Sequence, residues 1–336
     1  MHRMRRHGRR HWVRLLGRVL IGLSTGLMAT LAAAQAYPSK PVTIVVPWPP
    51  GAGTDAATRV IAEALGKELG QAVNVDNRAG ANGAIGSAYV ASGPADGYRL
   101  ITATADTHSI NPQLRKGLAY DAVKGFEPIA LFATLSMVWV ARPDLPYQTL
   151  AETVNAARQR QQVLNVGNWG IGSTAHLAGA LLEMATGLPM NQVPFQGASP
   201  AVTALGGGHI DLLPGSRLSA TTLRASGKLK VLGVAAAQRA GGALADVPTL
   251  AEQGINGAEI GSWYGLMAPK GTPEDVRAKL VAAVTKVLAM PAVKDKIAAT
   301  GLDPAFLAGN DFQDYLHQQY EVYGRIIRNK QISLNE

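Results

Sequence analysis

Two glycine-rich segments of the sequence each combine backbone amides, hydroxyl groups and an expected helix start. The first, residues 49–55, reads Pro-Pro-Gly-Ala-Gly-Thr-Asp, and the second, residues 170–174, reads Gly-Ile-Gly-Ser-Thr. The first amides of a helix have no partner within the helix, and glycine allows close approach to the backbone. Each segment therefore predicts a loop that receives a small anion. An ordinary strand-to-helix connection is the alternative for either loop taken alone.

These loops need strands before them and helices after them, and the chain supplies both in alternation. Short β-branched and apolar runs alternate with amphipathic segments, which is typical of an α/β protein. We expect strands at 42–46, 73–75, 98–103, 129–132, 137–141, 164–167, 191–193, 210–213, 231–235 and 263–268. We expect helices at 55–69, with Asp55 as its N-cap, and at 83–92, 149–160, 174–185, 198–206, 217–226, 273–289, 291–300 and 310–328. No Gly/Ser-rich or Pro-rich linker separates an N-terminal from a C-terminal half. If the protein has two domains, we therefore expect the chain to cross between them more than once.

The first 36 residues have the composition of an export signal. Seven arginines and no acidic residue occupy residues 1–18, an apolar stretch follows at 19–31, and small residues offer cleavage after Ala34 or Ala36. The apolar stretch is shorter than the roughly 20 residues that span a bilayer. We expect a signal peptide at 1–36, export by the Sec route and a periplasmic mature protein. The pair Arg9-Arg10 leaves the twin-arginine route as an alternative.

Composition excludes several classes of function. The seven signal arginines supply most of the formal net charge of +9, and no cluster of Lys and Arg remains that would favour nucleic acid. The chain has no cysteine, and the histidines after residue 36 are far apart, which argues against a metal site. We find no nucleophile elbow, no His-Glu-x-x-His motif and no phosphate-binding Gly-Lys-Ser/Thr loop. We therefore expect that the protein is not an enzyme and has no catalytic residue, cofactor or metal. We also expect a monomer.

A series of short motifs in a fixed order carries a family resemblance. The motifs occupy residues 37–41, 49–55, 77–83, 96–98, 110–112, 172–179, 193–197, 246–249 and 263–269. With these motifs the chain resembles the substrate-binding receptors of tripartite tricarboxylate transporters, the Bug family of periplasmic proteins, from Tyr37 to about Arg328. The resemblance implies an α/β, two-lobed periplasmic-binding-protein (Venus flytrap) fold, in which each lobe is a mainly parallel sheet flanked by helices. It also implies that residues 37–138 plus 264–336 form lobe one and residues 139–263 form lobe two.

By the same resemblance, the lobes close on a small organic anion and deliver it to membrane permease subunits. The anion would be a di- or tricarboxylate, an acidic amino acid or an aromatic carboxylate. A receptor that feeds a membrane signalling protein is one alternative, and a periplasmic enzyme is another. The residues expected to bind the ligand are Trp48, Gly51, Ala52, Gly53, Thr54, Asp55, Asp106, Thr107, Ser109, Trp169, Gly170, Gly172, Ser173, Thr174, His176, Gln196 and Gly197.

Several of these residues keep two interpretations open. Asp106 stands where the family has a small residue, and it either meets an ammonium or hydroxyl group of the ligand or forms a turn with its own backbone. His176 either donates to a carboxylate or orients its loop. Trp169 is expected to wall the pocket, whereas Trp263 belongs either to the pocket or to the core. Residues 212–216 lack an acid that is common in the family, which argues against an amino-acid ligand. Asp106 argues for one, so the class of carboxylate stays open.

Overall fold

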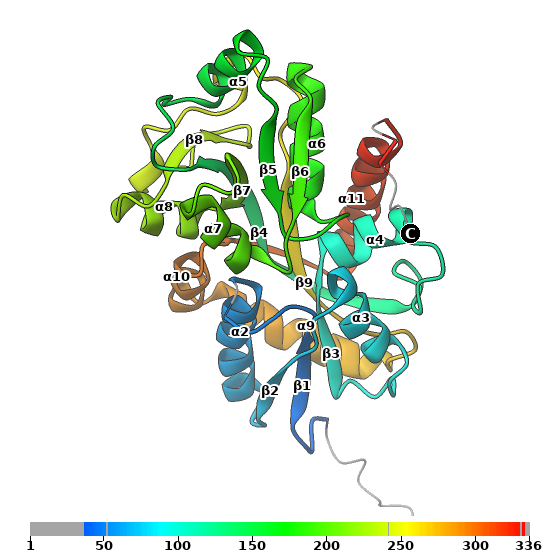
Figure 1. The fold of residues 1–336 in the computed structure, drawn as a ribbon. Helices are drawn as coiled ribbons and strands as arrows, with labels where there is room; N and C mark the ends of the chain where they lie inside the picture. The colour runs from blue at the N-terminus through cyan, green and yellow to red at the C-terminus, as the bar shows by residue number, and fades with distance from the viewer. Residues whose placement is uncertain (1–36, 52, 241, 330, 333–336) are drawn as a thin grey trace, which may run out of the picture. The chain divides into compact units, whose positions relative to one another are not determined.

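The computed structural model describes residues 37–51, 53–240, 242–329 and 331–332. The predicted signal peptide and Ala52 lie outside the described residues. The described residues from Lys40 onward form one compact unit, and its fold is an α/β sheet with connecting helices (Figure 1). The order of the strands along the sheet is β2-β1-β3-β9-β4-β7-β5-β6, and β8 and β10 both pair with β4.

Three parallel strands begin the sheet. Strand β1 (Val42–Val46) lies between β2 (Val73–Asn77) and β3 (Arg99–Thr104), and its apolar residues are buried. Helix α2 (Gly53–Leu69) connects β1 to β2, and helix α3 (Ala84–Ala91) precedes β3. Because the three strands are parallel, the loops that follow them leave the same edge of the sheet. We call these strands and the loops that follow them the β1 half.

A second parallel group follows later in the chain. Strand β5 (Leu164–Asn168) pairs in parallel with β6 (Met190–Pro194) and with β7 (Leu212–Ser216). The connecting helices are α6 (Thr174–Thr186) and α7 (Ala198–Gly206), and α8 (Arg217–Ala225) leads to β8 (Lys230–Val234). Helix α5 (Leu150–Gln159) precedes β5 and begins at a capping box made by Thr149 and Glu152. We call strands β5–β8 and their loops the β5 half.

Two long strands join the halves. Residues 126–136 of β4 (Phe126–Ala141) pair antiparallel with β9 (Gly261–Pro269), and β9 also pairs antiparallel with β3. Residues 137–141 of β4 pair antiparallel with β7, and residues 138–141 also pair with β8. In Figure 1, β4 and β9 run between the β1 half and the β5 half. The expected sheets were mainly parallel, but the sheet is mixed, because the two joining strands run against their neighbours.

The last part of the chain packs back on both long strands. Helices α9 (Glu274–Ala289) and α10 (Pro291–Ala299) precede β10 (Asp303–Ala308), which pairs antiparallel with β4, and α11 (Gly309–Asn329) ends the described fold. Trp263 is fully buried, and its ring packs edge-on against Phe312 of α11. Trp263 therefore belongs to the core. The remaining short elements are η1 (Ala81–Gly83), η2 (Asp106–Ile110), α4 (Asn111–Leu114), η3 (Gly242–Leu244) and η4 (Ala251–Gln253).

Apart from the short elements just named, the observed helices and strands follow the sequence pattern with three differences. The strands expected at 129–132 and 137–141 are one continuous strand, β4. Strand β10 was not expected, because it starts with Asp-Pro, which reads as a turn, and its side chains are only partly buried. Helix α2 begins at Gly53, so Asp55 lies in its first turn and is not its N-cap.

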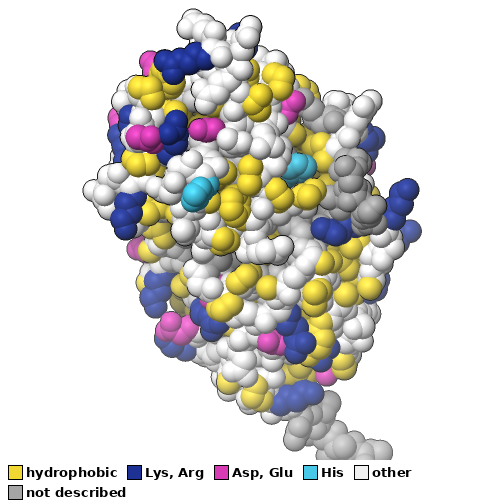
Figure 2. All heavy atoms as spheres, in the orientation of Figure 1, with side chains coloured by type: hydrophobic (Ala, Val, Ile, Leu, Met, Phe, Trp, Pro, Cys, Tyr) yellow, Lys and Arg dark blue, Asp and Glu magenta, His cyan; other side chains and the backbone are white. Residues whose placement is uncertain are grey.

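Two further observations concern the helices and the charged surface. Among the described residues, no helix combines the length and the apolar composition that crossing a membrane requires. On the face drawn in Figure 2, Lys and Arg side chains are dispersed among Asp and Glu over many elements.

Candidate ligand-binding site

The two glycine loops and the loops after β2 and β3 all lie at carboxyl ends of parallel strands. Ligands of open α/β sheets bind beyond this edge. The loop after β1 enters α2, and the loop after β5 enters α6. Both therefore present helix starts, whose first amides have no partner within the helix and favour an anion.

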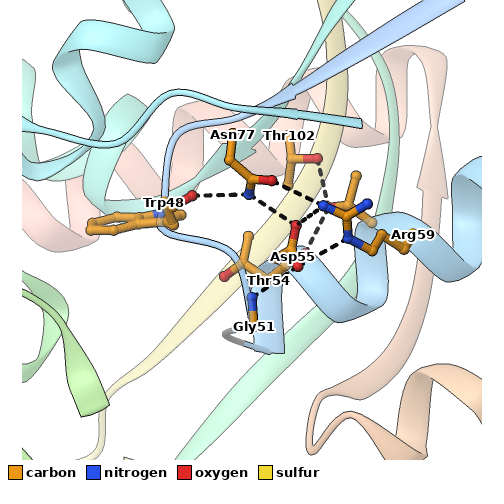
Figure 3. Close-up of polar contacts among 8 residues, drawn as sticks. Trp48, Gly51, Thr54, Asp55, Arg59, Asn77 and Thr102 are labelled. Carbon is orange, nitrogen blue, oxygen red and sulfur yellow. Dashed lines mark hydrogen bonds and ion pairs between the residues drawn. The ribbon is translucent and has the colours of Figure 1, made fainter. Parts of the chain in front are cut away.

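Asp55 braces the first loop from within. Its Oδ2 accepts from the Gly51 amide at 3.0 Å and from Arg59 Nε at 3.1 Å, and its Oδ1 accepts from Asn77 Nδ2 at 2.9 Å. The same Asn77 amide also donates to the Trp48 carbonyl at 3.1 Å. Figure 3 shows these donors around the carboxylate, with the Trp48 indole pointing away from it. Asp55 thus ties the loop to β2 and to its own helix.

Hydrogen bonding, rather than burial, decides the charge of Asp55. Burial acts to raise its pKa, but the bonds from Arg59, Gly51 and Asn77 together hold the pKa below its ordinary value. The side chain is therefore an ionised carboxylate whose oxygens are already engaged by the protein. Contact between Asp55 and a ligand stays a prediction.

A pair of asparagines connects the loops after β2 and β3. Asn111 Nδ2 donates to the Asn82 carbonyl at 2.8 Å, and Asn82 Nδ2 donates to Asn111 Oδ1 at 3.2 Å. Asn82 Nδ2 also lies 3.2 Å from the carbonyl oxygen of Gly172 in the β5 half. The expected site did not include these residues. Both lie within motifs that carry the family resemblance, which was the signal available for them.

The second loop is ordered by its own side chains. Ser173 caps α6 by accepting from the His176 amide, and Asn168 Oδ1 accepts from the Gly170 amide at 3.0 Å. His176 Nδ1 accepts from the Gly172 amide at 3.2 Å, so the histidine orients the loop. Burial lowers the His176 pKa, which favours the neutral ring that this bond requires. Gly172 has a φ of +77°, a conformation that glycine adopts without strain.

Asp106 joins the two halves at the site. Its Oδ1 accepts from the Thr174 amide at 2.7 Å and from the Thr174 hydroxyl, and its Oδ2 lies 3.4 Å from Trp169 Nε1. The residue is 4% exposed. Burial raises the pKa of Asp106, although the bonds from Thr174 and Trp169 oppose this effect. The hydrogen bonds from Thr174 show that the Asp106 carboxylate faces α6 and does not form the local turn that was one expectation.

The other expected residues follow the carboxyl ends of β1, β3 and β6. Thr54 is buried in the first turn of α2, and a Cβ on Gly53 would lie 3.3 Å from the Thr300 carbonyl oxygen. The Thr107 hydroxyl donates to the Thr104 carbonyl and lies 2.8 Å from His108 Nδ1. The remaining three are the fully buried Ser109, the exposed Gln196 and the N-cap residue Gly197 of α7. Their contacts with a ligand stay predictions.

His108, beside Asp106 in sequence, predicts a measurable pH dependence. The ring lies 4.7 Å from the Phe126 ring centroid, and burial lowers its pKa to about 3. Its folded pKa is thus depressed below the unfolded value of about 6.5, so its contribution to stability is complete above about pH 6.5 and is lost as pH falls. We expect it to account for about 2 kcal/mol of lost unfolding free energy between pH 7.5 and pH 5.

Denaturant unfolding at both pH values checks this expectation. The His108→Phe variant should lose about 2 kcal/mol less than the wild type over the interval, and the difference between the two proteins cancels other titrating groups. The same substitution at the exposed His209 is the control. An identical pH dependence in the wild type and His108→Phe would contradict the prediction.

The arrangement is suited to binding. Within the described ranges, no three His, Cys, Asp or Glu side chains gather as a metal site. The loops instead place backbone amides at two helix starts, and Asp106 engages the Thr174 hydroxyl and the Trp169 indole N–H there. A sheet of two halves, joined by two long strands and carrying such loops at the carboxyl ends of its strands, defines the class of two-lobed solute-binding receptors.

The comparison with known families agrees with this class. The family model of the tripartite tricarboxylate transporter family receptor matches residues 57–332. The chain belongs to this family.

Relatives and solved structures support the assignment. The chain is 30% identical to the protein BugT of Bordetella pertussis over 316 residues, covering 94% of this chain and 97% of BugT. It is 31% identical to Rpa4515 of R. palustris, solved with adipate, with a TM-score of 0.83 and coverage of 88% of this chain and 99% of that one. It is also 31% identical to MatC of Rhodopseudomonas palustris, solved with bound malate, with a TM-score of 0.77 and coverage of 87% and 100%.

Proposed function

We propose that this protein is a periplasmic solute-binding protein that captures a small organic carboxylate and presents it to tripartite tricarboxylate-type permease subunits. The observation that carries the proposal is the start of α6, where the Thr174 amide and hydroxyl hold a carboxylate, that of Asp106. Because helix starts have this chemistry, the start of α2, at the carboxyl end of β1, is the position left for a ligand carboxylate. Two relatives solved with adipate and malate support the same ligand class.

The ligand lies between two lobes, residues 37–138 plus 264–336 and residues 139–263. Two observations support these boundaries. Strand β4 exchanges β9 for β7 as its partner after Ser136, and β9 begins at Gly261. A ligand that touches both lobes stabilises the closed form by its differential affinity for that form. The receptor acts as a monomer after export and removal of residues 1–36.

Ligand stabilisation of the mature protein tests the proposal. We expect one or more carboxylates to raise the unfolding temperature in a concentration-dependent manner, while their methyl esters have no effect. Native mass spectrometry before and after incubation should recover the bound acid chemically unchanged, as a receptor requires and an enzyme would not. If the esters stabilise the protein as well as the acids do, or if no acid stabilises it, the proposed function is wrong.

A further inference from the structure

The start of α6 is occupied by a carboxylate of the chain itself. Asp106 comes from the loop after β3, and Thr174 is the first residue of α6, which follows β5. Asp106 Oδ1 accepts hydrogen bonds from both the backbone amide and the hydroxyl of Thr174. A ligand carboxylate that bound at the start of α6 would have to use these same two donors.

The position of Asp106 is also electrostatically demanding. Its hydrogen-bond partners among the described residues are Thr174 and Trp169, and neither is a cation. The side chain is almost fully buried, so water screens its charge poorly. A second carboxylate brought beside it would be desolvated and repelled, because two neighbouring carboxylates do not both ionise readily.

One oxygen of Asp106 retains capacity to accept. An ionised carboxylate accepts about four hydrogen bonds, whereas Oδ2 has a single long contact of 3.4 Å with Trp169 Nε1. A hydroxyl or ammonium group on a ligand could fill this position. An ionised ligand carboxylate has no proton to donate, so it could fill this position only together with a proton shared between the two acids.

We infer that Asp106 is a specificity-determining residue that takes the place of one ligand carboxylate, so that this receptor selects monocarboxylates over dicarboxylates of the same length. The inference rests on the proposed function, because it assumes that a carboxylate binds between the two loops. It assigns the single ligand carboxylate to the loop after β1 and an uncharged or hydrogen-bond-donating end to Asp106. The preferred ligand class therefore differs from the adipate and malate of the two relatives.

Matched acids test the inference by calorimetry on the mature protein. The probes are pairs of equal carbon number, from propanoate with malonate to octanoate with suberate, and 4-methylbenzoate with terephthalate, together with the ω-hydroxy acid of each aliphatic length. For the wild type we expect the monocarboxylate or hydroxy acid of the best-bound length to bind at least about tenfold more tightly than the diacid. For Asp106→Ala, which frees the Thr174 donors, we expect that ratio to fall by at least about tenfold.

Two further variants test the role of the Asp106 charge and provide a control at another carboxylate. Asp106→Asn keeps an oxygen that can accept from Thr174 but removes the charge, so its ratio should lie between those of the wild type and Asp106→Ala. Asp144→Ala removes an exposed carboxylate that pairs with Arg142, and it should leave the ratio unchanged.

The outcomes distinguish the inference from the proposed function. If acids bind and the ratio is the same in the wild type, Asp106→Ala and Asp106→Asn, the inference is overturned while the proposed function stands. A wild type that prefers diacids overturns it as well. If no acid binds to any of the proteins, the proposed function fails, and the inference fails with it.

Discussion

Asp55→Ala is expected to cost about 3 kcal/mol of unfolding free energy and to abolish carboxylate binding. The change leaves the Gly51 amide, the Asn77 side-chain amide and the Arg59 guanidinium without their shared acceptor. Arg59 is half exposed and recovers water, so the amides should carry most of the cost. The first loop then loses its tie to β2. Denaturant unfolding and calorimetric titration measure the two effects.

A neutral variant and a change of pH test the reason for this expectation. Asp55→Asn retains one acceptor oxygen and should cost less than Asp55→Ala. Because the folded pKa of Asp55 is depressed below its ordinary value of 3.8, its stabilisation is present above about pH 4 and is lost as pH falls through the lowered pKa. The stability gap between the wild type and Asp55→Ala should therefore narrow at pH 3. A gap that widens there would contradict the assigned role.

Gly83→Ala is expected to cost about 2 to 5 kcal/mol of unfolding free energy, because it combines backbone strain with a steric clash. Gly83 has a φ of +82°, and a Cβ there would lie 2.4 Å from Thr107 Cγ2 and 3.3 Å from Pro47 Cβ. These two neighbours belong to the loops after β3 and β1. A methyl group at Gly83 would therefore force apart the loops that form one wall of the candidate site, so we expect ligand affinity to fall as well.

Gly117→Ala is the matched control for this clash. Gly117 has a similar φ of +71°, but a Cβ there would have no neighbour within 4 Å. Its cost should reflect backbone strain alone, about 1 kcal/mol. Thermal and denaturant unfolding of both variants give the difference. Equal costs at the two positions would contradict the packing assigned to Gly83.

Local patterns predicted the elements of the site well. The β-branched run at 42–46 is β1, and the expected helix at 174–185 is α6 with Ser173 as its cap. These features depend on residues a few positions apart, so neighbouring residues contain the information. The edge strand β10 escaped prediction because half-buried edge residues show little periodicity.

Long-range partners could not be predicted from local patterns. The sequence places Asp106 in a loop, but only the folded chain brings it to Thr174, and the same is true of Asn82 and Gly172. Each of these contacts depends on how the β1 half and the β5 half meet. No residue near Asp106 in sequence indicates that its partner belongs to the start of a helix in the other half.

The joining strands also constrain the order in which the protein folds. Strand β3 pairs with β9, which brings Ile101 beside Met267, and β10 brings Asp303 beside Thr134. The β3 edge of the β1 half pairs with β9, so this edge has no partner strand until residues 261–269 have been made. The residues of β1, β2 and β3 therefore cannot complete the β1 half by themselves. Pairings between such distant residues give a high contact order and slow folding. For a protein whose proposed work begins only after export, such pairings delay completion of the fold until nearly all of the chain has been made.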